Sequence, residues 1–202
     1  MSKSLFISTS LFLLLSLNVK GQLAEKVNKF FGYEYHKATV VLNSGDTLKG
    51  EILFNNSYEN YKWLVYRDTL NKQKTDYKTE DVRIFVVDTM VFYPKKLKKK
   101  MVFMCLLFND SLKIYLHRYL SATQYYSGTE SMFIYEKPDG QTLEILTSRL
   151  FPFKKRVGEF FIDDPELSEK ILNKTYKFDD LYIIAKEYNT WLRQKKSATA
   201  LQ

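Results

Sequence analysis

The chain has 202 residues with a formal net charge of +8, which suits one domain, or one domain with an appendage, that meets anionic partners. Its single cysteine, Cys105, excludes an intramolecular disulfide, so stability must come from packing, to which 15 Tyr and 15 Phe contribute large apolar side chains.

Residues 1–21 have the layout of a secretory signal peptide. Lys3 gives a positive start, an apolar run follows from Leu5 to Leu17, and Val19-Lys20-Gly21 offers short residues to a signal peptidase. We expect cleavage near Gly21-Gln22 and export to the periplasm or the extracellular space, and we therefore expect no nucleic-acid partner. A membrane-spanning helix needs roughly 20 apolar residues, so we expect no transmembrane segment. A lipid anchor would need a cysteine just after the run, and the single cysteine is Cys105, so we expect no lipid anchor.

Residues 22–150 read as a β-rich domain built of successive hairpins. Turn formers recur at Asp46, Asp68, Asp88 and Asp110, and a last turn is predicted at 137–140. Gly50, inside a strand, predicts a bulge or bend. Residues 22–37 are open to a helix or a strand. The predicted strands are 39–42, 47–54, 63–66, 82–87, 90–93, 102–108, 112–116, 132–135 and 142–146.

Residues 151–196 have a helical period and form a C-terminal segment that we expect to pack on the sheet. Pro152 and Asp164-Pro165 mark two helix starts. Asp179 or Asp180 would cap a third helix, along which Leu181, Ile184, Tyr188 and Trp191 recur at helical spacing. Residues 197–202 form a frayed tail. Strands followed by helices predict an α+β fold: an antiparallel β-sheet or small barrel, then two or three packed helices.

The ordered motifs resemble an uncharacterised family of secreted Bacteroidetes proteins. The similarity covers nearly all of the chain after residue 21, and it implies no activity. The start also resembles Sm-like small barrels, at the level of the fold alone. The family resemblance rests on Asn43-Ser44-Gly45-Asp46-Thr47-Leu48-Lys49-Gly50-Glu51-Ile52, the strand start at 77–85, Asp164-Pro165-Glu166-Leu167, and Tyr188-Asn189 followed by Trp191.

No catalytic, cofactor or metal residue stands out. His36 and His117 lie in different elements without ligand-spaced partners, and His117 is predicted on the polar face of a strand. No nucleophile elbow or phosphate-binding glycine loop is present. Cys105 lies in an all-apolar run, which favours a buried core residue over a nucleophile.

Acidic residues cluster at Asp163-Asp164 with Glu166, and also at Glu80-Asp81 and Asp179-Asp180. A catalytic carboxylate pair is one interpretation. Helix capping is favoured, because anions stabilise a helix N-terminus.

Five lysines lie within seven residues between two predicted strands: Lys95, Lys96, Lys98, Lys99 and Lys100. One interpretation is a solvated loop that discourages aggregation. The other is an anion-binding loop that faces a membrane or a polyanion.

Four turns carry an Asp, then Ser or Thr, then an apolar residue, a pattern that resembles the O-glycosylation signal of periplasmic proteins in the same bacteria. The alternative is that Asp and Thr simply populate turns. The candidate acceptors are Thr47, Thr69, Thr89 and Ser111.

Together these features predict an exported cell-envelope protein that acts as a non-enzymatic binding or accessory module. Its partner would be an envelope protein or an anionic glycan or lipid surface, and no cofactor is expected. The alternative is an envelope glycan-acting hydrolase or transferase that uses carboxylates. A structural or assembly role in an envelope complex is a third possibility.

Overall fold

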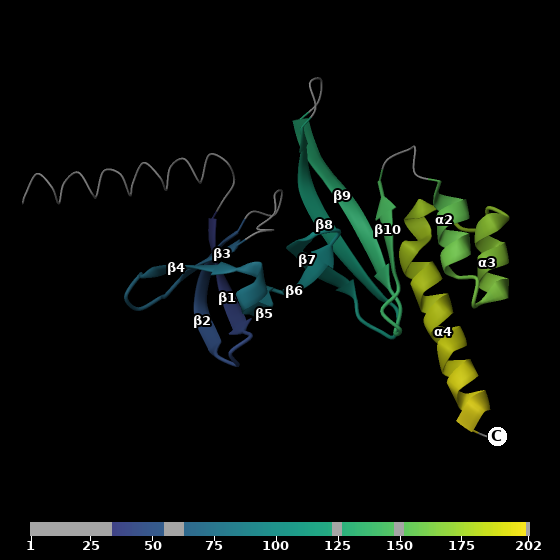
Figure 1. Cartoon of the computed structure of the whole chain (residues 1–202), viewed down its shortest axis with the longest axis horizontal. Helices are drawn as coiled ribbons and strands as arrows, with labels where there is room; N and C mark the ends of the chain where they lie inside the picture. The colour runs from purple at the N-terminus through teal and green to yellow at the C-terminus, as the bar shows by residue number, and fades with distance from the viewer. Residues whose placement is uncertain (1–33, 55–62, 123–126, 148–151, 201–202) are drawn as a thin grey trace, which may run out of the picture.

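A computed structural model describes residues 34–54, 63–122, 127–147 and 152–200 (Figure 1). The strands are β1 (Glu34–Leu42), β2 (Thr47–Phe54), β3 (Trp63–Arg67), β4 (Lys74–Lys78), β5 (Val82–Val87), β6 (Met90–Leu97), β7 (Lys100–Phe108), β8 (Lys113–Ala122), β9 (Ser127–Glu136) and β10 (Thr142–Leu146). The helices are α2 (Phe153–Phe160), α3 (Pro165–Leu172) and α4 (Leu181–Ala200), with 3-10 turns η1 (Thr79–Asp81) and η2 (Phe178–Asp180).

The described strands form one antiparallel sheet in the order β10-β9-β8-β7-β6-β5-β1-β2-β3-β4. The predicted α+β class with an antiparallel sheet and C-terminal helices is confirmed. The small-barrel alternative is wrong, because the strand order begins at β10 and ends at β4, and these two strands do not pair with each other. Each of them has one neighbour in the sheet, so the sheet stays open.

The first core lies within the end of the sheet formed by β1 to β5, which Figure 1 shows at the opposite end of the molecule from the helices. Phe103 of β7 also belongs to this core, so β7 connects the two ends. The buried residues are Ala38, Val40, Ile52, Phe54, Leu64, Tyr66, Val82, Phe85, Val87 and Phe103.

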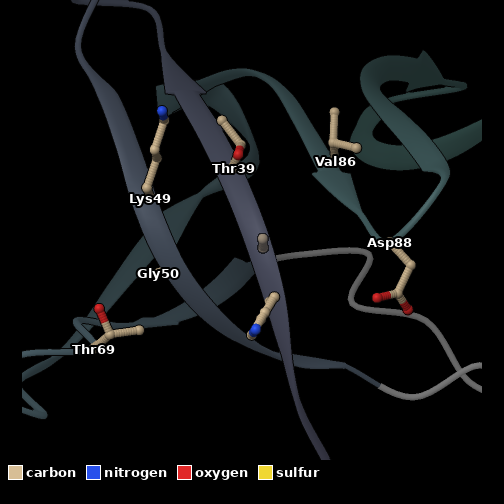
Figure 2. A pocket seen from close by; sticks show the side chains of 8 residues that line it. Thr39, Lys49, Gly50, Thr69, Val86 and Asp88 are labelled. Carbon is tan, nitrogen blue, oxygen red and sulfur yellow. The ribbon is translucent and has the colours of Figure 1, made fainter.

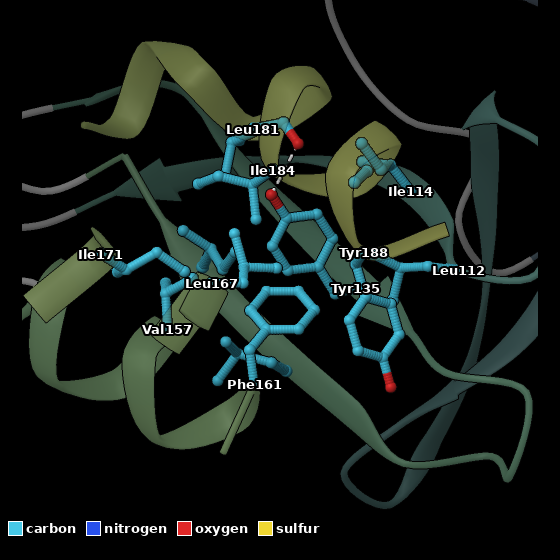
Figure 3. Close-up of a cluster of buried hydrophobic side chains, with 13 residues drawn as sticks. Leu112, Ile114, Tyr135, Val157, Phe161, Leu167, Ile171, Leu181, Ile184 and Tyr188 are labelled. Atoms are coloured by element: carbon cyan, nitrogen blue, oxygen red, sulfur yellow. Dashed lines mark hydrogen bonds between the residues drawn. The ribbon is translucent and has the colours of Figure 1, made fainter. Parts of the chain in front are cut away.

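The second core lies between the sheet and the three helices (Figure 3). Tyr135 pairs with Ile114 on one side and with Leu143 on the other, so all three side chains share one face of the sheet. The Tyr135 hydroxyl donates a hydrogen bond of 2.7 Å to the Leu181 carbonyl. The helices contribute Val157, Phe161, Leu167, Ile171, Leu181, Ile184, Ala185 and Tyr188 to the buried set.

Further polar contacts of Asn189 and Lys137 hold the helical segment against the sheet. The Asn189 side chain of α4 accepts a hydrogen bond of 2.7 Å from the Leu112 backbone N–H. It donates a second one, of 3.3 Å, to the Leu112 carbonyl. Lys137, at the β9–β10 turn, lies 2.6 Å from Asp163 Oδ1, and the Tyr188 hydroxyl donates 2.5 Å to Asp163 Oδ2. These residues therefore tie α4 and the α2–α3 connection to the ends of two hairpins.

Three details differ from the sequence-based expectations. β4 is a strand that the sequence did not reveal, because its Lys-Thr-Asp-Tyr-Lys pattern lacks apolar alternation. Gly50 marks no bulge: a Cβ there would lie 2.5 Å from the Tyr66 ring, so glycine permits a close approach instead. Helix α4 continues to Ala200, past the predicted end at residue 196, with Ser197 and Thr199 donating to carbonyls four residues earlier.

Candidate anion-binding hairpin

The lysine-rich segment is not a loop but the end of the β6–β7 hairpin. Leu97 pairs with Lys100, so only Lys98 and Lys99 form the turn. Lys98 has a φ of 54°, in the left-handed region that tight hairpin turns require. The two strands thus bring the lysines to one end of the hairpin, with Lys96 and Lys100 on opposite faces of it.

Lys95 differs from the other four lysines because its charge is already compensated. Its Nζ lies 2.5 Å from Glu136 Oε2 and 4.6 Å from the centre of the Tyr115 ring. Burial acts to lower the pKa of Lys95, but hydrogen bonds with Glu136 and Tyr115 outweigh it, and the pKa lies above its usual value. We therefore remove Lys95 from the candidate anion-binding set.

The remaining lysines are exposed at the tip and make no ion pair with any residue in the described ranges. Leu97, which lies between them, packs against the sheet's own apolar cluster around Tyr115. It is therefore not free to insert into a membrane. We call Lys96, Lys98, Lys99 and Lys100 the lysine tip.

The four candidate glycosylation residues all lie at strand starts or turns. Thr47, Thr69 and Thr89 are exposed, whereas Ser111 is half-buried. Leu70, next to Thr69, is 93% exposed, so this motif is the one most open to a modifying enzyme. Glycosylation stays a prediction.

The two histidines are separated, and His117 is not on a polar face as predicted. It is 4% exposed, stacks on Tyr119 with ring centres 5.8 Å apart, and has its pKa lowered by burial to about 4. His36 Nδ1 lies 3.7 Å from Asp88. Within the described ranges, no three His, Cys, Asp or Glu residues gather as a metal site would require.

Most of the acidic residues singled out in the sequence cap helices or form ion pairs. Asp164 is the N-cap of α3 and accepts 3.2 Å from the Leu167 N–H, which confirms the capping interpretation. Asp163 holds Lys137, and Glu166 pairs with Lys170 one turn along α3. Asp81 and Asp180 accept from backbone N–H groups at the start of the two 3-10 turns.

Cys105 is buried as predicted, with 8% of its surface exposed. Burial raises the pKa of its thiol, which opposes formation of the reactive thiolate.

No family model, no curated protein and no solved structure matches the chain. Within the part that the structure describes, none of the helices combines the length and apolar character needed to cross a bilayer.

Proposed function

We propose that the protein is exported and binds an anionic membrane surface of the cell envelope through the lysine tip, without catalysing a reaction. The observation that carries this proposal is a hairpin end with four exposed lysines and no compensating carboxylate among the described residues. The signal-peptide pattern of residues 1–21, which lies outside the described residues, supports export. So does the resemblance to a secreted Bacteroidetes family.

The expected affinity follows from the charge of the tip. A lysine near an anionic leaflet contributes about 1 kcal/mol, so four contribute about 4 kcal/mol, which corresponds to a Kd on the order of 1 mM. Screening extends over about 10 Å at 0.1 M salt. Binding should therefore be reversible and should weaken steeply as salt is raised.

The test is sedimentation of the chain from Gln22 onward with vesicles of phosphatidylcholine and phosphatidylserine at low salt. The tip variant carries Lys96→Gln, Lys98→Gln, Lys99→Gln and Lys100→Gln. The matched control loses the same four charges from exposed helical-segment positions: Lys155→Gln, Lys177→Gln, Lys186→Gln and Lys196→Gln.

We expect the wild type and the control to sediment with the vesicles and the tip variant to stay in solution. Equal loss in both variants would show that net charge alone binds the vesicles. Failure of the wild type to sediment, even at low salt, would end the proposal.

Export is tested separately. The intact mass of the protein recovered outside the cytoplasm should correspond to a chain that starts at Gln22. Retention of residues 1–21 would overturn the localisation. Additional mass that disappears in Thr69→Val would identify the exposed acceptor as glycosylated.

A further inference from the structure

A second polar site lies on the outer face of the other end of the sheet. It is an open groove of about 410 Å³ over β1, β2 and β5 (Figure 2). Lys49 and Thr69 line one side in Figure 2, Val86 and Asp88 line the other, and Thr39 lies between them. None of these residues belongs to the β6–β7 hairpin, so the groove is distinct from the lysine tip.

Core residues on the other face of the sheet support the base of the groove. Ala38 and Gly50 are directly paired across β1 and β2, and they line the groove at its base. The Tyr66 ring packs so closely on Gly50 that no Cβ would fit, and its hydroxyl donates 3.1 Å to the Lys49 carbonyl. The strand segment that carries Lys49 is therefore fixed, which favours a preformed site.

The charges around the groove are mixed. Lys37 and Lys49 make no ion pair with any residue whose position the structure describes. Asp88 adds one carboxylate, and Thr39 and Thr69 add hydroxyls that both donate and accept. Asp88 occupies the left-handed region with a φ of 52°, and the turn after β5 thereby brings its carboxylate to the groove.

This combination distinguishes between ligands. A bare inorganic anion would gain from the two ammonium groups but would be repelled by Asp88. A neutral sugar would satisfy Asp88 and the threonines but leave both ammonium groups without a counter-charge. A sugar ring that carries a carboxylate matches every polar group in the groove, because its hydroxyls donate to Asp88 and its carboxylate faces the lysines.

We propose that this groove binds a sugar acid, such as a uronic acid unit of a polysaccharide. The volume lies within the range of small-molecule sites. Because the groove is exposed, its charges are screened by water, and a single ring should bind weakly, with a Kd on the order of 1 mM or above.

The test is a ¹H–¹⁵N NMR titration of the chain from Gln22 onward with glucuronate, with glucose and with inorganic phosphate as separate probes. Glucuronate should shift the amides of β1 and β2 saturably, and the other two probes should bind about tenfold more weakly. Lys37→Gln combined with Lys49→Gln should weaken glucuronate binding about tenfold. Lys177→Gln combined with Lys186→Gln removes two exposed charges outside both sites; it is the control and should leave glucuronate binding unchanged.

Asp88→Asn is the decisive variant, because asparagine also tolerates the left-handed conformation and keeps the turn. It should weaken glucuronate and strengthen phosphate, reversing the preference. Saturable phosphate binding as tight as that of glucuronate in the wild type would show a simple cationic patch and overturn the proposal. So would an unchanged preference in Asp88→Asn, or no saturable shift with glucuronate. Vesicle binding by the lysine tip is independent of every one of these results.

Discussion

Removing the Asp163 charge should destabilise the protein more than removing its partner, Lys137. The two side chains form an ion pair of 2.6 Å, but they differ in burial: Lys137 is 5% exposed and Asp163 is 38% exposed. Asp163→Asn would leave a buried ammonium group without its carboxylate. Lys137→Met would leave a carboxylate that water still reaches.

The magnitudes follow from that asymmetry. Breaking a buried pair typically costs about 3–5 kcal/mol when the remaining charge stays buried. The Phe160 carbonyl, 2.6 Å from Lys137 Nζ, and the Phe160 ring, 4.6 Å away, would still stabilise the ammonium group in Asp163→Asn. We therefore expect a loss at the lower end, about 3 kcal/mol, against about 1–2 kcal/mol for Lys137→Met. The double variant should recover part of the Asp163→Asn loss, because no charge is left unpaired.

The assay is urea unfolding of the wild type, the two single variants and the double variant at neutral pH, read as a double-mutant cycle. The free energy of unfolding should fall with urea concentration at the same slope in all four proteins. Differences in the midpoint of unfolding then report differences in stability. Equal losses in the two single variants, or a double variant whose loss is the sum of the two, would refute the reasoning from burial.

Three further predictions concern single buried residues. Asn189→Ala should cost about 2–3 kcal/mol in urea unfolding, because the buried Leu112 N–H and carbonyl lose their partner; a loss below about 1 kcal/mol would contradict that role. A thiol reagent should modify Cys105 only after denaturant is added, since the side chain is buried; rapid labelling of the native protein would contradict its core assignment. Burial lowers the pKa of His117 to about 4 from 6.5, so the stability that its neutral form contributes is complete above pH 6.5 and falls as the pH drops toward 4, by about 3 kcal/mol. His117→Gln should flatten the dependence of the urea midpoint on pH over that range, and an unchanged dependence would argue against titration of His117.

Local sequence patterns predict the secondary structure correctly where a segment has a strong hydrophobic periodicity or a strong helix cap. Asp164-Pro165 marks the start of α3 correctly, because an N-cap and a proline at the first helical position act within one turn. The strands around Ile52 and Ile114 follow from apolar alternation. These signals need no knowledge of the rest of the fold.

Other features depend on contacts between distant segments, and the sequence does not display them. Lys137 looks like an ordinary turn residue until α2 brings the Phe160 carbonyl to it. By its place in the apolar–polar alternation of the sequence, His117 looks like an outward-facing polar residue. In the structure it lies opposite Met132 and faces the buried cluster. The groove residues Lys37 and Lys49 were missed for the same reason, because their proximity comes from the pairing of β1 with β2.

The lysine segment shows that composition alone can predict the wrong secondary structure. Five lysines predict a loop by composition, but the apolar residues at alternate positions of β7 hold both strands in register up to the turn. The packing of Leu97 and the pairing of Lys95 with Glu136 both require that register. Tertiary contacts thus override the local preference of lysine for irregular structure.

The strand order has a kinetic consequence. Among the described strands, eight of the nine pairings join sequence neighbours, so most of the sheet can form from local hairpins, and only the pairing of β1 with β5 closes a longer segment. Docking of α4 is different, since Asn189 meets Leu112 across 77 residues. Contacts so distant along the chain form late and slow the final step. A polypeptide emerging from its amino end would therefore complete the first core once β7 has emerged, and the second core would form only after the last helix, α4, has docked.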